Sequence, residues 1–81
     1  MKLRNLLENL LAFPHVLKKI EATWGSEECR WYIHNIMRQQ DRPQRQGFPH
    51  YVFRTLYDLA LLHDEEFPEY RPQPGPWDFA N

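Results

Sequence analysis

The residues that could bind a metal ion or act as nucleophiles are few and widely spaced. No two of them lie three or four residues apart, and the paired cysteines of structural zinc sites are missing from the sequence. The sequence also carries no nucleophile motif and no glycine-rich phosphate loop. We therefore expect no metal site, no cofactor and no enzymatic activity. The residues concerned are Cys29, His15, His34, His50 and His63.

The single cysteine, Cys29, excludes an internal disulfide and suits a reducing compartment. It falls on the apolar face of a predicted helix, close to the N-terminus of that helix. A helix N-terminus can lower the pKa of a thiol and make it reactive. A buried thiol that packs as a small apolar group is the interpretation that we prefer.

Arginines gather just before the third predicted helix. Arg38, Arg42 and Arg45 precede His50, which lies in the first turn of that helix. Guanidinium groups and free amides at a helix N-terminus can together hold a phosphate or a carboxylate. The alternative is a solvated loop whose arginines pair with nearby acidic residues. We keep residues 38–50 as a candidate anion- or RNA-binding site, as the alternative to a protein–protein interaction function.

Binding of duplex DNA through a helix-turn-helix is disfavoured by charge. Gly25 and Ser26 join two predicted helices, but Glu27 and Glu28 occupy the first turn of the second helix. That turn of a recognition helix meets base edges and phosphates, and the phosphates would repel the two carboxylates. Nucleic acid is therefore not the partner that we expect.

The length and charge of the chain limit what it can be. Its 81 residues suffice for one small domain and not for two separate cores. The formal net charge of −1 argues against electrostatic capture of nucleic acid or of an anionic membrane. Five arginines and one aspartate give +4 over residues 30–54, and six acidic residues and one arginine give −5 over residues 55–81. Such a chain can close on itself or pair head to tail with a partner.

Apolar runs are too short for a membrane span or for the apolar core of a signal peptide. No such run exceeds four residues, whereas a membrane-spanning helix needs about 20. We expect a cytoplasmic protein that does not enter a membrane.

Hydrophobic residues recur at helical spacing over about residues 2–24, 27–40 and 49–63. Pro14 interrupts the first segment without shifting its hydrophobic spacing. It either kinks one long helix or begins a second helix, and the sequence leaves both alternatives open. The apolar stripe of this segment comprises Leu3, Leu6, Leu10, Phe13, Leu17, Ile20 and Trp24, and it is widened by Leu7 and Val16.

The first two segments are separated by the clearest turn signal in the chain. Gly25 suits the left-handed backbone position that follows a helix end. Ser26 is a good N-cap for the next helix, and Glu27 and Glu28 place negative charge in its first turn, where the helix dipole favours it.

The second segment has an apolar and a polar face. Trp31 falls at their boundary. The apolar face carries Cys29, Tyr32, Ile33, Ile36 and Met37, and the other face carries Arg30, His34, Arg38 and Asp41.

The third segment is apolar most of the way round, which is typical of a helix buried on several sides. A bundle of this size does not need so much apolar surface for its own core, and the surplus indicates an interface. We expect a homodimer or a complex with a protein partner. The residues assigned to this interface are Tyr51, Tyr57, Leu61 and Leu62, with Trp31 nearby.

Residues 67–81 are rich in proline, which excludes a helix and favours extended or polyproline-like backbone. Trp77 and Phe79 are unusual in a dispensable tail and are added to the predicted interface residues. The tail either wraps the helices and completes their core, or it is a free peptide that a partner recognises through an aromatic-lined groove. We divide the chain into a helical domain, 1–66, and this extension, 67–81.

The predicted fold is all-α: a small bundle of three or four short helices with the proline-rich tail packed on it. The predicted function is a non-enzymatic protein–protein interaction module, such as a small regulatory or adaptor protein. A hydrophobic helix face would supply its affinity, and the arginine loop and the acidic end would orient the partner.

Overall fold

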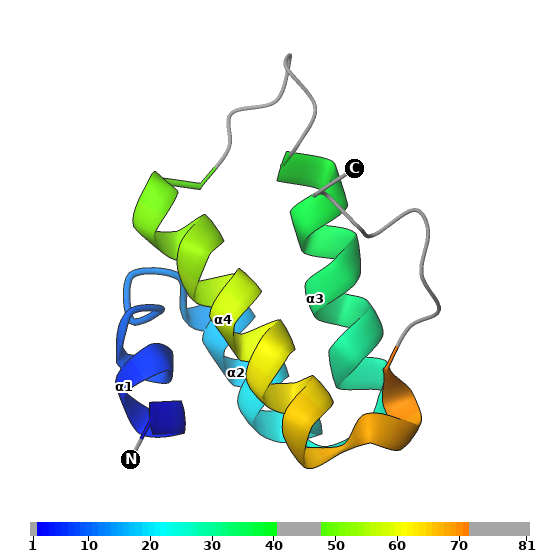
Figure 1. Cartoon of the computed structure of the whole chain (residues 1–81). Coiled ribbons are helices and arrows are strands. Elements are labelled where there is room, and N and C mark those ends of the chain that lie inside the picture. The colour runs from blue at the N-terminus through cyan, green and yellow to red at the C-terminus, as the bar shows by residue number, and fades with distance from the viewer. Residues whose placement is uncertain (1, 41–47, 72–81) are drawn as a thin grey trace.

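The computed structural model describes residues 2–40 and 48–71, which form an all-α bundle as predicted (Figure 1). No strand occurs in these two ranges, and no helix in them is long and apolar enough to cross a bilayer. The predicted packing of the proline-rich tail falls outside the described residues from residue 72 onwards. The elements are α1 (Lys2–Glu8), α2 (Pro14–Thr23), α3 (Glu27–Gln40), α4 (His50–Glu66) and a 3-10 helix, η1 (Pro68–Tyr70).

Pro14 divides the first predicted segment into two helices, so the two-helix alternative is the right one. Helix α1 ends at Glu8, and α2 begins with Pro14 as its first residue. The missing amide of proline costs nothing at this position, because the first amides of a helix have no partner within the helix. Between the two helices the chain turns tightly, and the Phe13 amide donates to the Leu10 carbonyl at 2.9 Å.

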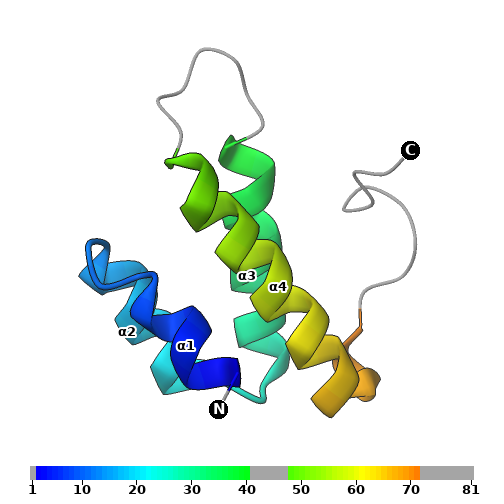
Figure 2. The ribbon, with the colours of Figure 1, turned by 60° about the vertical axis from the view of Figure 1, so that its left-hand side comes forward.

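Helices α1 and α2 run antiparallel and lie side by side at one edge of the bundle (Figure 2). Their main packing partners are nevertheless different: α1 packs on α4, α2 packs on α3, and α3 and α4 pack on each other. The α1 contact includes a hydrogen bond from the Asn9 side-chain amide to Thr55 Oγ1 at 3.2 Å. This division of contacts is what leaves room between α1 and α2.

The corner between α2 and α3 is formed as predicted. Gly25 has a φ of +90°, in the left-handed region that glycine adopts without strain. Ser26 caps α3, because its Oγ accepts a hydrogen bond from the Cys29 amide at 3.1 Å and donates one to the Thr23 carbonyl at 2.6 Å. Glu27 and Glu28 lie in the first turn of α3.

The hydrophobic core lies where α2, α3 and α4 meet. Cys29 is fully buried in it, as preferred from the sequence, and burial raises the pKa of its thiol. Ten buried residues form the core cluster: Leu10, Val16, Ile20, Cys29, Ile33, Met37, Val52, Leu56, Leu59 and Ala60.

The chain does not become extended directly after α4. Pro68–Tyr70 form a 3-10 helix, so the predicted extended backbone is wrong for these three residues. Proline is compatible with the first position of a 3-10 turn for the same reason as in an α-helix. This turn packs on α4 and keeps the Phe67 ring beside Gly25, where a β-carbon would lie 3.1 Å from the ring.

Replacing Gly25 with alanine is expected to lower the free energy of unfolding by about 1–2 kcal/mol, because alanine is strained at this φ and would press on Phe67. Urea denaturation followed by circular dichroism measures the change. Lys18→Ala, on the exposed surface of α2, is the control and is expected to change stability by less than about 0.5 kcal/mol. Equal stability of the wild type and Gly25→Ala would contradict the prediction.

Candidate functional site

Four of the predicted interface residues are exposed. Trp31 is 43% exposed, Tyr51 50%, Tyr57 38% and Leu61 43%. Tyr57 and Leu61 lie one turn apart on α4, whereas Tyr51 is rotated by about 120° from Tyr57 around the helix at 100° per residue. The described members of the predicted interface therefore do not form one continuous patch on α4.

Leu62 is a correction to that prediction, because its side chain is only 9% exposed. It follows Leu61 by a rotation of 100°, which turns it to the face of α4 that also carries the buried Thr55 and Leu59. Trp77 and Phe79, the tail residues assigned to the interface, lie outside the described residues.

The predicted anion-binding residues are only partly placed. Arg38 is exposed in the last turn of α3, and His50 is exposed at the first position of α4. These two helix ends lie at the same end of the bundle (Figure 1). Arg42 and Arg45 fall outside the described residues, so the predicted convergence of all four side chains stays a prediction.

A hollow between α1 and α2 is the feature that the sequence reasoning missed. It has a volume of about 460 Å³, which is within the usual range of about 300–1,000 Å³ for binding sites. Four leucines and three charged residues line it: Leu3, Leu7, Leu11, Leu17, Arg4, Glu8 and Glu21. We call this feature the leucine hollow.

The leucine hollow exists because α1 carries leucines on two faces. Leucines that are adjacent in the sequence point about 100° apart on a helix, so one packing partner cannot bury both. Leu10, in the turn after α1, is fully buried, whereas its neighbour Leu11 is 67% exposed. The leucine pairs at residues 6–7 and 10–11 are the sequence signal for apolar side chains on two faces. They do not show that a hollow forms, because the open space depends on the distance between α1 and α2.

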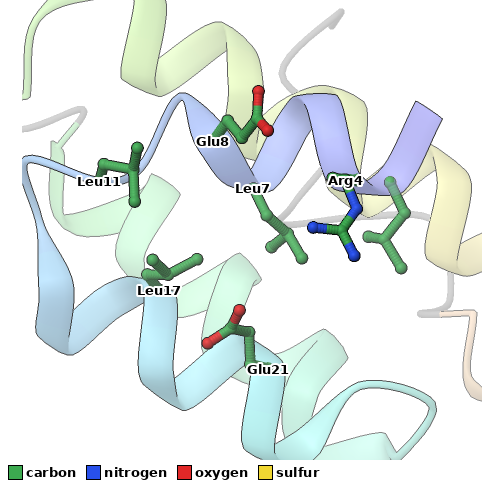
Figure 3. A pocket seen from close by; sticks show the side chains of 7 residues that line it. Arg4, Leu7, Glu8, Leu11, Leu17 and Glu21 are labelled. Atoms are coloured by element: carbon green, nitrogen blue, oxygen red, sulfur yellow. The ribbon is translucent and has the colours of Figure 1, made fainter. Parts of the chain in front are cut away.

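The two ends of the leucine hollow differ in character, as Figure 3 shows. Leu11 and Leu17 lie at one end, where the chain turns from α1 into α2. Arg4 on α1 and Glu21 on α2 lie towards the other end, and Leu7 projects into the space between the helices. We call the end at Leu11 and Leu17 the apolar end and the end at Arg4 and Glu21 the charged end. Glu8 also lines the hollow, one turn from Arg4 towards the apolar end, and Leu3 lines it next to Arg4.

A second group of residues corrects the predicted polar face of α3. Arg30 is fully buried and His34 is only 4% exposed, although both were assigned to the polar face, opposite the apolar one. Asp64 on α4 explains the burial of Arg30, because its two carboxylate oxygens accept hydrogen bonds from Arg30 Nε at 2.8 Å and from Nη2 at 3.3 Å. A guanidinium paired in this way can leave water without becoming an isolated charge.

His63 connects α4 to the corner between α2 and α3. It is fully buried, and its Nε2 accepts a hydrogen bond from the Gly25 amide at 3.1 Å. The Trp24 and Phe67 rings pack against its imidazole, with centroids at 4.8 Å and 4.9 Å. Because Nε2 accepts this hydrogen bond, the imidazole is neutral and carries its hydrogen on Nδ1.

The buried histidines have lowered pKa values. For His63 and for His34, burial is the main cause and the positive charge of Arg30 is the second. Because Arg30, His34 and His63 are each at most 4% exposed, no substrate can reach them without opening the bundle. Within residues 2–40 and 48–71, no group of three or more His, Cys, Asp or Glu residues is arranged to hold a metal ion.

Asp64→Ala is expected to lower the free energy of unfolding by about 3–5 kcal/mol, because it removes the carboxylate from a buried guanidinium. Replacing both partners, as Arg30→Met with Asp64→Leu, should cost less than half as much, because no buried charge then remains. Chemical denaturation of both variants measures the difference. A double variant less stable than Asp64→Ala would contradict this account.

Stability is expected to fall as the pH drops from about 7 to about 5. The folded state favours neutral His34 and His63, whereas these residues in the unfolded chain gain a proton near their ordinary pKa of 6.5. The unfolded state therefore binds more protons below pH 6.5, and each histidine lowers stability by up to about 1.4 kcal/mol per pH unit until its lowered pKa is reached.

Urea denaturation at several pH values measures this slope. His63→Gln keeps an acceptor for the Gly25 amide and removes the titrating group, so the slope between pH 7 and pH 5 is expected to become shallower. His15→Gln, at an exposed position in α2, is the control and is expected to keep the wild-type slope. A slope that is the same in all three proteins would contradict the assignment.

Comparison of the sequence and the structure with models of protein families, with curated proteins and with solved structures found no match. A function for this chain is therefore argued from its own residues and their geometry.

Proposed function

We propose that this chain is a non-enzymatic protein–protein interaction module and that the leucine hollow is its docking site. The observation that carries the proposal is the set of four leucines around an open hollow of about 460 Å³ between two consecutive helices. Leucine side chains are usually buried within a small bundle, so leucines that stay partly open to solvent around a hollow are candidates for contact with a partner.

The leucine hollow can supply binding energy. Leu11 is 67% exposed, and Leu3, Leu7 and Leu17 are half-buried. Complete burial of a leucine side chain contributes about 1.5–3 kcal/mol, so covering several partly exposed leucines yields several kcal/mol before the costs of association. The apolar content of the hollow therefore suits an apolar partner surface.

The shape of the hollow suits a helix. Two antiparallel helices with leucines on their facing sides form a groove, and amphipathic helices fill such grooves with side chains at helical spacing. Arg4 and Glu21 add opposite charges at one end of the groove, which orient a partner more than they increase its affinity.

The exposed residues Trp31, Tyr57 and Leu61 offer a second surface for the same kind of function. These residues lie on α3 and α4, away from the lining of the leucine hollow. They are large and partly exposed, but they do not line the hollow. The experiment below separates the two surfaces.

Leu11→Glu and Leu61→Glu form a matched pair, because each places a carboxylate on an exposed leucine without entering the core. The tagged full-length protein and both tagged variants are used to capture proteins from extracts of the source cells. An untagged copy of the chain is added to the extract, so that capture of a second copy is also detected. We expect Leu11→Glu to reduce specific capture at least about ten-fold and Leu61→Glu to leave it unchanged.

Circular dichroism confirms that both variants are folded before capture is compared. Loss of capture in Leu61→Glu alone would place the docking site on the outer face of α4 and would refute the leucine hollow as the site. Unchanged capture in both variants, or no specific capture by the wild type, would refute the proposed docking function of the hollow.

A further inference from the structure

We propose that the leucine hollow is covered by the same hollow of a second copy of this chain, in a two-fold symmetric dimer in which Arg4 of each copy pairs with Glu21 of the other. This inference rests on the proposed function, because it names the partner for the same docking site. Three observations carry it: the polarity of the hollow, the charges left unpaired at its rim and the exposure of Leu11.

The polarity of the hollow makes it complementary to itself. Helices α1 and α2 run antiparallel along its two sides, with Arg4 on one side and Glu21 on the other at the charged end. A two-fold axis that runs along the hollow, parallel to both helices, exchanges the two sides and keeps each end in place. It therefore lays α1 of one copy over α2 of the other. Arg4 of each copy then lies opposite Glu21 of the other copy.

The charges at the rim are available for such pairing. Arg4 and Glu21 form no ion pair with each other or with any other residue in the described ranges. Elsewhere on the surface, Lys19 pairs with Glu28, and Arg54 pairs with Asp58. The leucine hollow thus has groups of both signs that are unpaired within the described ranges: Arg4 and Glu8 on the α1 side and Glu21 on the α2 side. A two-fold interface that sets Arg4 opposite Glu21 matches opposite charges across it.

The apolar end of the hollow fits the same arrangement. The axis that matches the charges also brings the apolar ends of the two hollows together, so that Leu11 of each copy approaches Leu17 of the other. At 67%, Leu11 has the highest exposure among the large hydrophobic residues exposed in the described part of the chain. Its burial is the main apolar gain of the dimer.

Sedimentation equilibrium of the full-length chain tests the association directly. Over a range from about 1 to about 300 μM at moderate salt, the weight-average mass is expected to rise from 9.9 kDa towards twice that value. Leu11→Glu is expected to remain monomeric over the same range, whereas Leu61→Glu should associate like the wild type.

Charge reversal tests the specific pairing. Arg4→Glu alone and Glu21→Arg alone each place like charges opposite each other in both pairs, so the dissociation constant is expected to rise at least about ten-fold in each. An equimolar mixture of these two variants restores both ion pairs, and it is expected to form a mixed dimer with an affinity near that of the wild type. The same reversal within one chain, Arg4→Glu with Glu21→Arg, should also restore dimerisation.

Arg54→Glu is the control, because it changes an exposed arginine outside the leucine hollow and is expected to leave the dissociation constant unchanged. The proposed dimer is refuted if the wild type stays monomeric at every concentration. It is also refuted if Leu11→Glu or Arg4→Glu dimerises with the same dissociation constant as the wild type. A monomeric wild type whose capture of another protein is lost in Leu11→Glu would refute the dimer and support the docking function. A monomeric wild type whose capture survives Leu11→Glu would refute both.

Discussion

The arrangement of the bundle depends on the contact between the Gly25 amide and the His63 imidazole. It joins the corner between α2 and α3 to α4, two parts of the chain that lie 38 residues apart. The glycine supplies the left-handed turn, and the absence of a side chain lets the Phe67 ring close over it. His63 can accept this hydrogen bond only as a neutral group, and burial among the Trp24 and Phe67 rings favours that neutral form. With this corner fixed, α3 pairs with α4 through Arg30 and Asp64.

The same arrangement determines where the bundle stays open. Helices α2, α3 and α4 meet around the buried core, whereas α1 packs mainly on α4, and directly after α1 the Asn9 side chain donates a hydrogen bond to Thr55 of α4. The short connection between α1 and α2 holds them side by side without bringing them into close contact. Leu3, Leu7 and Leu17 consequently pack against the core and also line the hollow. This hollow is the basis for the proposed interaction function and for the proposed partner, a second copy of the chain.

Local signals in the sequence were enough to predict the helical segments and the corner between α2 and α3, because turn and capping chemistry acts over a few residues. Gly25 and Ser26 are the clearest examples. The same signals left open whether Pro14 kinks or divides the first segment and did not predict the end of α1 at Glu8. The burial of Arg30 could not be predicted in this way, because it depends on Asp64, which lies 34 residues away. Leu62 was misplaced because an almost wholly apolar helix does not show which side faces the core. The leucine hollow was missed because it reflects the spacing of two helices, which hydrophobic periodicity does not encode.

The complete burial of Cys29 has a consequence for oxidation chemistry. Oxidation of cysteine to a sulfenic acid or to a mixed disulfide requires an accessible thiolate. The thiol of Cys29 is enclosed by the core and its pKa is raised, so it is protonated at neutral pH and shielded from peroxide and glutathione. As the chain has no other cysteine, changes in the cellular redox state should leave the folded protein chemically unaltered at thiol groups. Its interactions would then respond to concentration and to pH rather than to oxidants.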